Sequence, residues 1–218
     1  SATTWLEQYQ PDKALFRGRS YQIIKRLMDL CIVLITMPFW LALMLLIFIL
    51  LKTQSPGAPA LFIQPRTGKD GKRFNMYKFR TMVANAEEIK DQYAHLNELQ
   101  WPDFKISNDP RVTRLGRFLR KSSLDELPQV FNVLRGEMSL VGPRPTSFSA
   151  KDYQLWHTER LDVMPGLTGV WQIIGRGQTE FDDRLRLDIA YMEHRCISLD
   201  ISILFRTVMA IFEQRGTF

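Results

Sequence analysis

An uninterrupted apolar segment constrains this chain more than any other feature of its sequence. Residues 30–51, "LCIVLITMPFWLALMLLIFILL", carry no charge, and Thr36 is the one polar side chain among them. As a straight helix the segment would measure about 33 Å, enough to cross a hydrocarbon core of about 30 Å. It is too long for a signal peptide, lies well inside the chain and has no A-x-A cleavage site after it. We therefore place this segment in a membrane.

The apolar segment could span the bilayer or enter and leave by the same face. Pro38 would break a helix in the middle of the run, and Thr36 could satisfy the freed backbone groups. Asp29 would then lie at the interface, where Lys25 or Arg26 could pair with it. Basic residues, which favour the cytoplasmic side, flank both ends of the run. They are Lys13, Arg17, Arg19, Lys25 and Arg26 before it, and Lys52, Arg66, Lys69, Lys72 and Arg73 after it. We favour the re-entrant arrangement.

The residues after the apolar segment predict a β-hairpin and several helices. Residues 60–64 and 73–82 have strand composition and are joined through the turn at 68–71. Residues 84–99 are charged and helix-forming. Residues 109–121, "DPRVTRLGRFLRK", place apolar side chains on one helical face and basic ones around the rest.

The C-terminal part predicts one irregular stretch and one helix. Residues 165–177, "PGLTGVWQIIGRG", are typical of a glycine-rich turn, a short strand and another turn. Residues 199–216 predict a helix packed on the core or on the bilayer.

These elements indicate an α+β protein that is mostly helical. The 218 residues are enough for one sizeable core. We expect an N-terminal extension over residues 1–24, a re-entrant membrane helix over 25–52, and a catalytic domain over 53–218. The last of these would hold the small β-hairpin and amphipathic helices at the membrane interface. The missing initiator methionine suggests a piece of a longer protein.

Residues 123–145, "SLDELPQVFNVLRGEMSLVGPRP", place two carboxylates before a short amphipathic helix that Gly136 would end. Ser123 and Glu126 have the spacing of a capping box, so the acidic pair could serve only to cap. Pro128 fits a helix start nearer Asp125. In either register the carboxylates lie at the positive end of a helix, which favours their ionised form. An ionised Asp125 could act as a nucleophile.

The basic residues point to an anionic partner. The formal net charge is +6, which suits nucleic acid, anionic lipid or a phosphorylated substrate. The basic helix could anchor to lipid headgroups or line a phosphate site, and Arg120 is the best phosphate candidate because it lies nearest the carboxylates. The two cysteines and three histidines lack the spacing of a zinc site.

Five motifs in order resemble the monotopic phosphoglycosyl transferases, also called bacterial sugar transferases. They are Lys25-Arg26-x-x-Asp29 before the apolar run, "KFRTM" at 78–82, "DPRVTRLGRFLRKSSLDELPQ" at 109–129, "GPRP" at 142–145 and "PGLTGVWQIIGR" at 165–176. The resemblance implies transfer of a sugar 1-phosphate from a UDP-sugar to a polyprenyl (undecaprenyl) phosphate. It also implies Mg²⁺ dependence and the cytoplasmic face of the bacterial inner membrane. Small members of the family often have serine before the helix-breaking proline, where this chain has Met37.

The resemblance assigns roles to the acidic pair and to the arginine between prolines. Asp125 would be the nucleophile that carries the sugar phosphate, with release of UMP. Glu126 would be the base for the second step or help Asp125 organise Mg²⁺. Arg120 and Arg144 would offset the charge of the diphosphate, with Arg144 held between two prolines. Weaker phosphate or donor-binding candidates are Arg111, Lys78, Arg80 and Arg176.

Two other classes of protein remain open at this point. Tyr77, Phe79 and Trp171 near arginines would suit a nucleic-acid-binding protein on a membrane tether. A non-catalytic membrane scaffold would use the carboxylates only as caps. Neither explains the ordered motifs, so we expect a sugar-nucleotide donor, a lipid acceptor and the bilayer as partners, and no nucleic acid. The oligomeric state stays open, with a homodimer as one arrangement.

Overall fold

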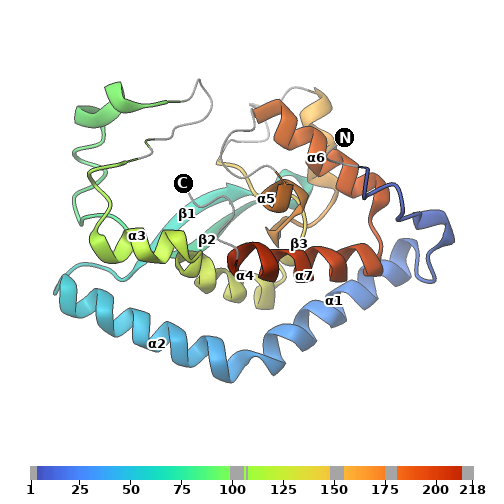
Figure 1. The fold of residues 1–218 in the computed structure, drawn as a ribbon, viewed down its shortest axis with the longest axis horizontal. Helices are drawn as coiled ribbons and strands as arrows, with labels where there is room; N and C mark the ends of the chain where they lie inside the picture. Colours follow the sequence, from blue (N-terminus) through green and yellow to red (C-terminus); the bar gives the residue numbers. More distant parts are fainter. Residues whose placement is uncertain (1–3, 99–105, 107, 148–154, 175–180, 213–218) are drawn as a thin grey trace.

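Most of the chain is helical, and its strands form two small sheets (Figure 1). The structure is a computed structural model that describes residues 4–98, 106, 108–147, 155–174 and 181–212. The α-helices are α1 (Gly18–Ile35), α2 (Met37–Gln54), α3 (Arg114–Lys121), α4 (Val130–Arg135), α5 (Val170–Ile174), α6 (Phe181–His194) and α7 (Ile197–Phe212). The 3₁₀ segments are η1 (Pro11–Lys13), η2 (Lys69–Gly71), η3 (Asp91–Leu96), η4 (Leu124–Gln129) and η6 (Leu155–Asp162). The strands are β1 (Leu61–Thr67), β2 (Arg73–Phe79), β3 (Ser139–Val141) and β4 (Gly166–Thr168).

Both sheets have two strands. β1 and β2 pair antiparallel, with Leu61 opposite Phe79 and Thr67 opposite Arg73, which confirms the predicted hairpin. β3 and β4 pair parallel, with Ser139 opposite Gly166. The mixture of a dominant helical part with small sheets confirms the α+β class.

The apolar segment is interrupted at Thr36, where α1 ends and α2 begins at an angle to it (Figure 1). Pro38 lies in the first turn of α2, where a missing N–H is tolerated. The hydroxyl of Thr36 donates to the carbonyl of Ile32 at 2.7 Å, as predicted for a residue beside the break. Trp40, which the sequence did not single out, donates its indole N–H to the carbonyl of Val33 at 2.9 Å. The carbonyls of Ile32 and Val33, near the end of α1, therefore each accept a side-chain hydrogen bond beside the break.

Helix α2 is apolar around its whole circumference. One stripe, formed by Trp40, Met44, Ile47 and Leu51, is buried, and Trp40 packs edge-to-face on Phe131 of α4. The other faces expose large apolar side chains, of which Phe39 is 79% exposed. Within the described residues this is the one helix long and apolar enough to cross a membrane, judged by length and composition alone. A helix that is apolar on every face and exposes large apolar side chains on most of them suits a lipid environment.

Helix α1 is attached to the rest of the protein by buried polar contacts. Asp29 is 1% exposed and accepts a hydrogen bond from the Ser139 hydroxyl at 2.6 Å. Lys25 instead forms an ion pair with the buried Asp200 at 3.0 Å, and Arg26 donates to the backbone carbonyls at the end of α4. The expected pairing of Asp29 with Lys25 or Arg26 is therefore wrong, because both cations find acceptors on elements distant in sequence.

Two predicted helical features are wrong. Residues 84–98 form turns and the 3₁₀ segment η3 instead of an α-helix, since packing buries only Ala86 among them and most helical stability comes from such packing. Ser123 has a positive φ of 57° and its side chain makes no capping hydrogen bond, so the capping box does not form. The carboxylates of Asp125 and Glu126 lie in η4, and α4 begins only at Val130. Gly136, with φ 77°, ends α4 as predicted.

The other predictions hold in part. The basic helix is confirmed over α3, and the C-terminal helix is confirmed to Phe212. In the stretch 165–177 the strand comes first, as β4, and "VWQII" forms the helix α5. β-Branched residues favour strands, but packing of α5 against α6 and α7 overrides that preference.

Gly116 lets α3 approach the chain beyond β2 and generates a stability prediction. A Cβ atom at Gly116 would lie 1.9 Å from the Thr81 carbonyl oxygen, which is backbone and cannot rotate away. We expect Gly116→Ala to lower the free energy of unfolding by about 1–3 kcal/mol or more. The measurement is the thermal unfolding midpoint in lipid nanodiscs. Gly68→Ala is the matched control, because its added methyl would meet the movable Phe74 ring at 3.2 Å. Equal midpoints for the two variants would contradict this account of the packing.

Candidate active site

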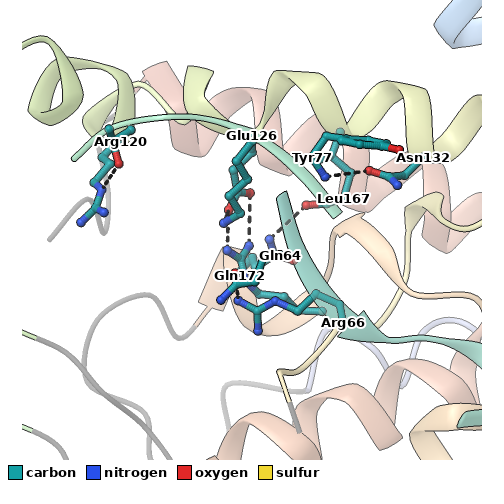
Figure 2. A network of polar contacts seen from close by, with 11 residues as sticks. Gln64, Arg66, Tyr77, Arg120, Glu126, Asn132, Leu167 and Gln172 are labelled. Atoms are coloured by element: carbon teal, nitrogen blue, oxygen red, sulfur yellow. Dashed lines mark hydrogen bonds and ion pairs between the residues drawn. The ribbon is translucent and has the colours of Figure 1, made fainter. Parts of the chain in front are cut away.

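Four elements bring together five of the charged residues that the sequence predicted. Asp125 and Glu126 lie on η4, Lys78 near the end of β2, Arg120 on α3 and Arg144 in the loop after β3. Figure 2 shows Glu126 pointing away from the η4 backbone, with Arg120 apart from it at the left of the view. The site therefore depends on contacts between segments up to 66 positions apart, from Lys78 to Arg144.

Glu126 is held by two cations. Lys78 donates to Oε1 of Glu126 at 2.9 Å, and Arg144 donates from both terminal nitrogens, to Oε2 at 3.2 Å and to Oε1. This is the two-pronged geometry that suits a planar guanidinium and a carboxylate. Burial would raise the pKa of Glu126, but the charges and hydrogen bonds of Arg144 and Lys78 hold it well below its usual range. Glu126 is therefore ionised and fixed in place.

Asp125 has the opposite electrostatic situation. Among the described residues, none forms a hydrogen bond or close ion pair with its carboxylate, and the side chain is partly exposed. Burial and the charge of Glu126 raise the pKa of Asp125 to about 6, against the opposing charges of Lys78, Arg120 and Arg144. The predicted helix end is a 3₁₀ segment instead of an α-helix, and burial raises the pKa, but a carboxyl with a pKa of about 6 is still mostly ionised at pH 8. Asp125 is therefore the carboxylate of the pair that a ligand could meet without displacing a partner among the described residues.

Arg120 and Arg144 are the cations best placed to meet a ligand. Arg120 uses its Nε to donate to the Thr81 hydroxyl at 2.9 Å, which orients its guanidinium without neutralising it. Arg144 is held by Glu126 and by the Trp171 ring, whose centroid lies 5.9 Å from its Cζ, yet 32% of its side chain stays exposed. Three cations thus surround two carboxylates, which leaves one positive charge for an anion.

Several polar residues near this cluster were missed by the sequence reasoning. Gln64 accepts a hydrogen bond from Arg66 at 2.6 Å, and Gln172 donates to the carbonyl of Leu167 at 3.1 Å. Figure 2 shows Gln64 and Gln172 on the side toward which Glu126 points. Trp171 had been noted only as an aromatic near arginines. Gln172 adjoins that tryptophan in the "PGLTGVWQIIGR" motif, which was the available signal, whereas nothing in the sequence marked Gln64.

The weaker phosphate candidates have different surroundings. Arg111 is buried and paired with Asp109 at 2.7 Å, so a phosphate would have to compete with a carboxylate. Arg80 is 9% exposed, and its Nη1 has no hydrogen-bond partner among the described residues. Arg176 lies outside the described residues. Phosphate binding by these three arginines stays a prediction.

The carboxylates fit one kind of magnesium site. Mg²⁺ is commonly bound by one or two carboxylates together with substrate phosphates, instead of a cage made wholly of protein. Asp125 offers hard oxygen ligands that no described residue occupies, whereas Glu126 already has two cationic partners. The described part of the chain gathers no group of three or more potential metal ligands. The residues therefore suit a Mg²⁺ ion that a phosphorylated substrate helps to bind.

Comparison with known proteins gives a consistent result. The bacterial sugar transferase family matches residues 20–214. The undecaprenyl-phosphate galactose phosphotransferase of Salmonella typhimurium is 41% identical over 206 residues, which cover 92% of this chain and 43% of that protein. The galactosyl transferase CpsE of Streptococcus agalactiae is 42% identical over 172 residues, covering 78% and 38%.

A shorter relative matches along most of its length. The exopolysaccharide production protein ExoY of Rhizobium meliloti is 37% identical over 199 residues, which cover 89% of this chain and 88% of ExoY. This chain thus spans less than half the length of the Salmonella and Streptococcus relatives but most of ExoY. The family match extends over the apolar helices and over every element that carries the charged cluster. This chain belongs to the bacterial sugar transferase family.

Proposed function

We propose that this protein transfers a sugar 1-phosphate from a UDP-sugar to undecaprenyl phosphate and so begins the assembly of a membrane-bound glycan. The observation that carries the proposal is the unpartnered Asp125 beside a Glu126 fixed by Lys78 and Arg144. The named activities of the relatives, which include undecaprenyl-phosphate galactose and glucose phosphotransferases, support the choice of donor and acceptor.

The reaction would occur in two displacements at one phosphorus atom. A carboxylate oxygen of Asp125 attacks the sugar-bearing phosphorus, the bond to the leaving oxygen breaks, and UMP departs with that electron pair. The protein then carries the sugar phosphate as an acyl phosphate. An oxygen of undecaprenyl phosphate attacks the same phosphorus, which frees the Asp125 carboxylate and yields the lipid diphosphate sugar.

The cations offset the electrostatic repulsion that is the main energetic obstacle to the first step. A carboxylate that approaches a diphosphate in a low-dielectric site meets repulsion of several kcal/mol. Arg144 presents a guanidinium fork that its loop and Glu126 hold in place, and Arg120 adds a second cation. Mg²⁺, when bound, would supply further neutralisation of the phosphate charge. Preorganised cations of this kind cost little reorganisation when charge develops at the phosphorus.

Glu126 suits a supporting role better than that of a free base. With its pKa held low and both ion pairs in place, it is a weak proton acceptor. It can still orient Arg144 and help bind the metal beside Asp125. It could assist the second step as a base only after one of its ion pairs opens.

The membrane arrangement follows from the acceptor. A polyprenyl chain leaves the bilayer only at about 0.8 kcal/mol per exposed CH₂, so the enzyme must work at the lipid surface. Helix α2 packs against α4 through Trp40 and Phe131, and α4 directly follows the segment with Asp125. We propose that α1 and α2 form a re-entrant unit, with the charged cluster at the cytoplasmic face of the bacterial inner membrane.

Re-entry predicts that both flanks of the apolar segment lie on one face. In a chain whose Cys31 and Cys196 are replaced by serine, cysteines introduced at Leu15 and at Lys72 should both resist a membrane-impermeant maleimide in intact cells. Both should react after permeabilisation, because like-charged flanks favour the same side. Labelling of one position but not the other in intact cells would mean that the helix spans the bilayer.

The guanidinium fork predicts that charge alone cannot replace Arg144. Arg144→Lys keeps a positive charge but loses the two-pronged contact, so turnover should fall about 100-fold. UMP release with a saturating UDP-sugar and undecaprenyl phosphate is the measurement. Arg186→Lys, at an exposed position on α6, is the control and should keep full activity. A lysine variant as active as the unaltered enzyme would contradict the role of Arg144 as a clamp, that is, a two-pronged holder of the donor phosphate.

The covalent step predicts an adduct on one residue. With UDP-sugar and Mg²⁺ but no acceptor, the protein should release about one UMP per active site and gain the mass of the sugar phosphate. Asp125→Asn should abolish both adduct and turnover, because an amide is a poor nucleophile. Glu126→Gln should slow adduct formation as well as transfer to the lipid, because it weakens the contacts that orient Arg144. Intact-protein mass spectrometry decides the matter, and an adduct that persists in Asp125→Asn would remove Asp125 from the nucleophile's role.

A further inference from the structure

A buried ion pair outside the charged cluster is connected to the Arg144 loop. Arg160 of η6 and Asp188 of α6 approach to 2.6 Å, and they are 6% and 1% exposed. Nη2 of Arg160 also donates a hydrogen bond to the backbone carbonyl of Arg144. One guanidinium therefore joins a buried carboxylate on α6 to the residue that holds Glu126.

Helix α6 reaches the same loop by a second route. The Trp171 ring of α5 has the guanidinium of Arg144 at 5.9 Å from its centroid and that of Arg184, on α6, at 5.5 Å. α6 also packs on both α5 and η6. The backbone of Arg144 is thus linked to Asp188 through Arg160, and its side chain to Arg184 through the Trp171 ring. Arg184 and Asp188 are four residues apart on α6.

The ion pair could serve stability alone, but its placement argues for a further role. The free-energy cost of taking two charges out of water often cancels their mutual attraction. Buried ion pairs therefore contribute little net stability compared with apolar residues of similar size. Burial raises the pKa of Asp188 to about 6, with the charges of Arg160 and Arg184 opposing the shift, so the carboxylate is ionised at pH 8. The buried pair is costly, but its arginine also donates a hydrogen bond to the Arg144 carbonyl. That bond fixes the direction of the Arg144 backbone, which apolar packing would not do.

We propose that Arg160 and Asp188 are positioning residues that fix the Arg144 clamp. Asp188 orients the Arg160 guanidinium, Arg160 holds the Arg144 carbonyl, and the Arg144 side chain then meets Glu126 and the donor phosphate at a set angle. This inference rests on the proposed function, because it concerns the same clamp. A misplacement of about 1 Å in such a group can cost about 100-fold in rate.

The test is a double-mutant cycle between Arg160 and Arg144. Arg160→Lys keeps the buried charge opposite Asp188 but replaces the rigid planar guanidinium, whose Nη2 contacts both Asp188 and the Arg144 carbonyl, by a flexible ammonium group. We expect it to lower turnover about 10- to 100-fold in the otherwise unaltered enzyme, and less than about 2-fold in an Arg144→Ala background. Equal losses in both backgrounds would overturn the proposal and leave the ion pair with a structural role only.

If Arg144→Ala has no measurable turnover, the same double-mutant cycle is measured by UDP binding instead. The dissociation constant of UDP, measured in nanodiscs at pH 8 with Mg²⁺, should rise in Arg160→Lys and in Asp188→Asn but not further when either is combined with Arg144→Ala. Additive changes would contradict the proposal. Asp183→Asn, which removes a carboxylate from an exposed position on the same helix, is the control and should change neither measurement.

The outcomes separate this inference from the proposed function. If the unaltered enzyme neither releases UMP nor binds UDP, the proposed function fails. If the unaltered enzyme is active and the cycle is additive, the proposed function stands and the positioning role fails. Thermal unfolding midpoints accompany each variant. Should Asp188→Asn fail to fold because it leaves Arg160 unpaired, Arg160→Lys alone decides the question.

Discussion

The ion pairs of Glu126 determine the arrangement of the whole site. Lys78 from the hairpin and Arg144 from the loop after β3 meet on one carboxylate of η4, so three separate segments share a single charged contact. A buried carboxylate without such partners would be protonated or unstable. With these partners Glu126 stays ionised. It binds the Arg144 guanidinium at the position that directly follows Asp125. The neighbouring carboxylate is then left without a partner, which gives the two acidic groups different chemistry.

The same segment also joins the site to the apolar helices. Arg26 of α1 donates to the carbonyls of Val133 and Leu134 at the end of α4, and Trp40 of α2 packs on Phe131 of the same helix. Because η4 leads directly into α4, the acidic pair is fixed relative to the part of the chain that suits lipid. This attachment supports the proposal that a lipid-linked acceptor meets the acidic pair, and neither a nucleic-acid-binding tether nor a scaffold needs it.

Local signals in the sequence predicted much of the fold, but not the partners of the charged residues. Glycine turns and strand composition were enough for the hairpin, and Gly136 marked the end of a helix because its positive φ suits glycine. Proximity in sequence favoured Arg120 as a phosphate-binding residue and ranked Lys78 low, and it gave no sign that Lys78 contacts Glu126 across 48 positions. The capping box of Ser123 failed because the backbone there turns left-handed. Long-range pairs such as Arg160 with Asp188 leave no local pattern to read.

The central claim is the division of labour between Asp125 and Glu126, and an experimental structure with a non-transferable UDP-sugar analogue and Mg²⁺ tests it most directly. A carboxylate oxygen of Asp125 should lie about 3–3.5 Å from the sugar-bearing phosphorus, in line with the oxygen of the leaving UMP. Glu126 should remain paired with Arg144. A structure in which Glu126 faces the phosphorus, or in which Asp125 points away from it while Arg144 contacts no phosphate oxygen, would contradict the account.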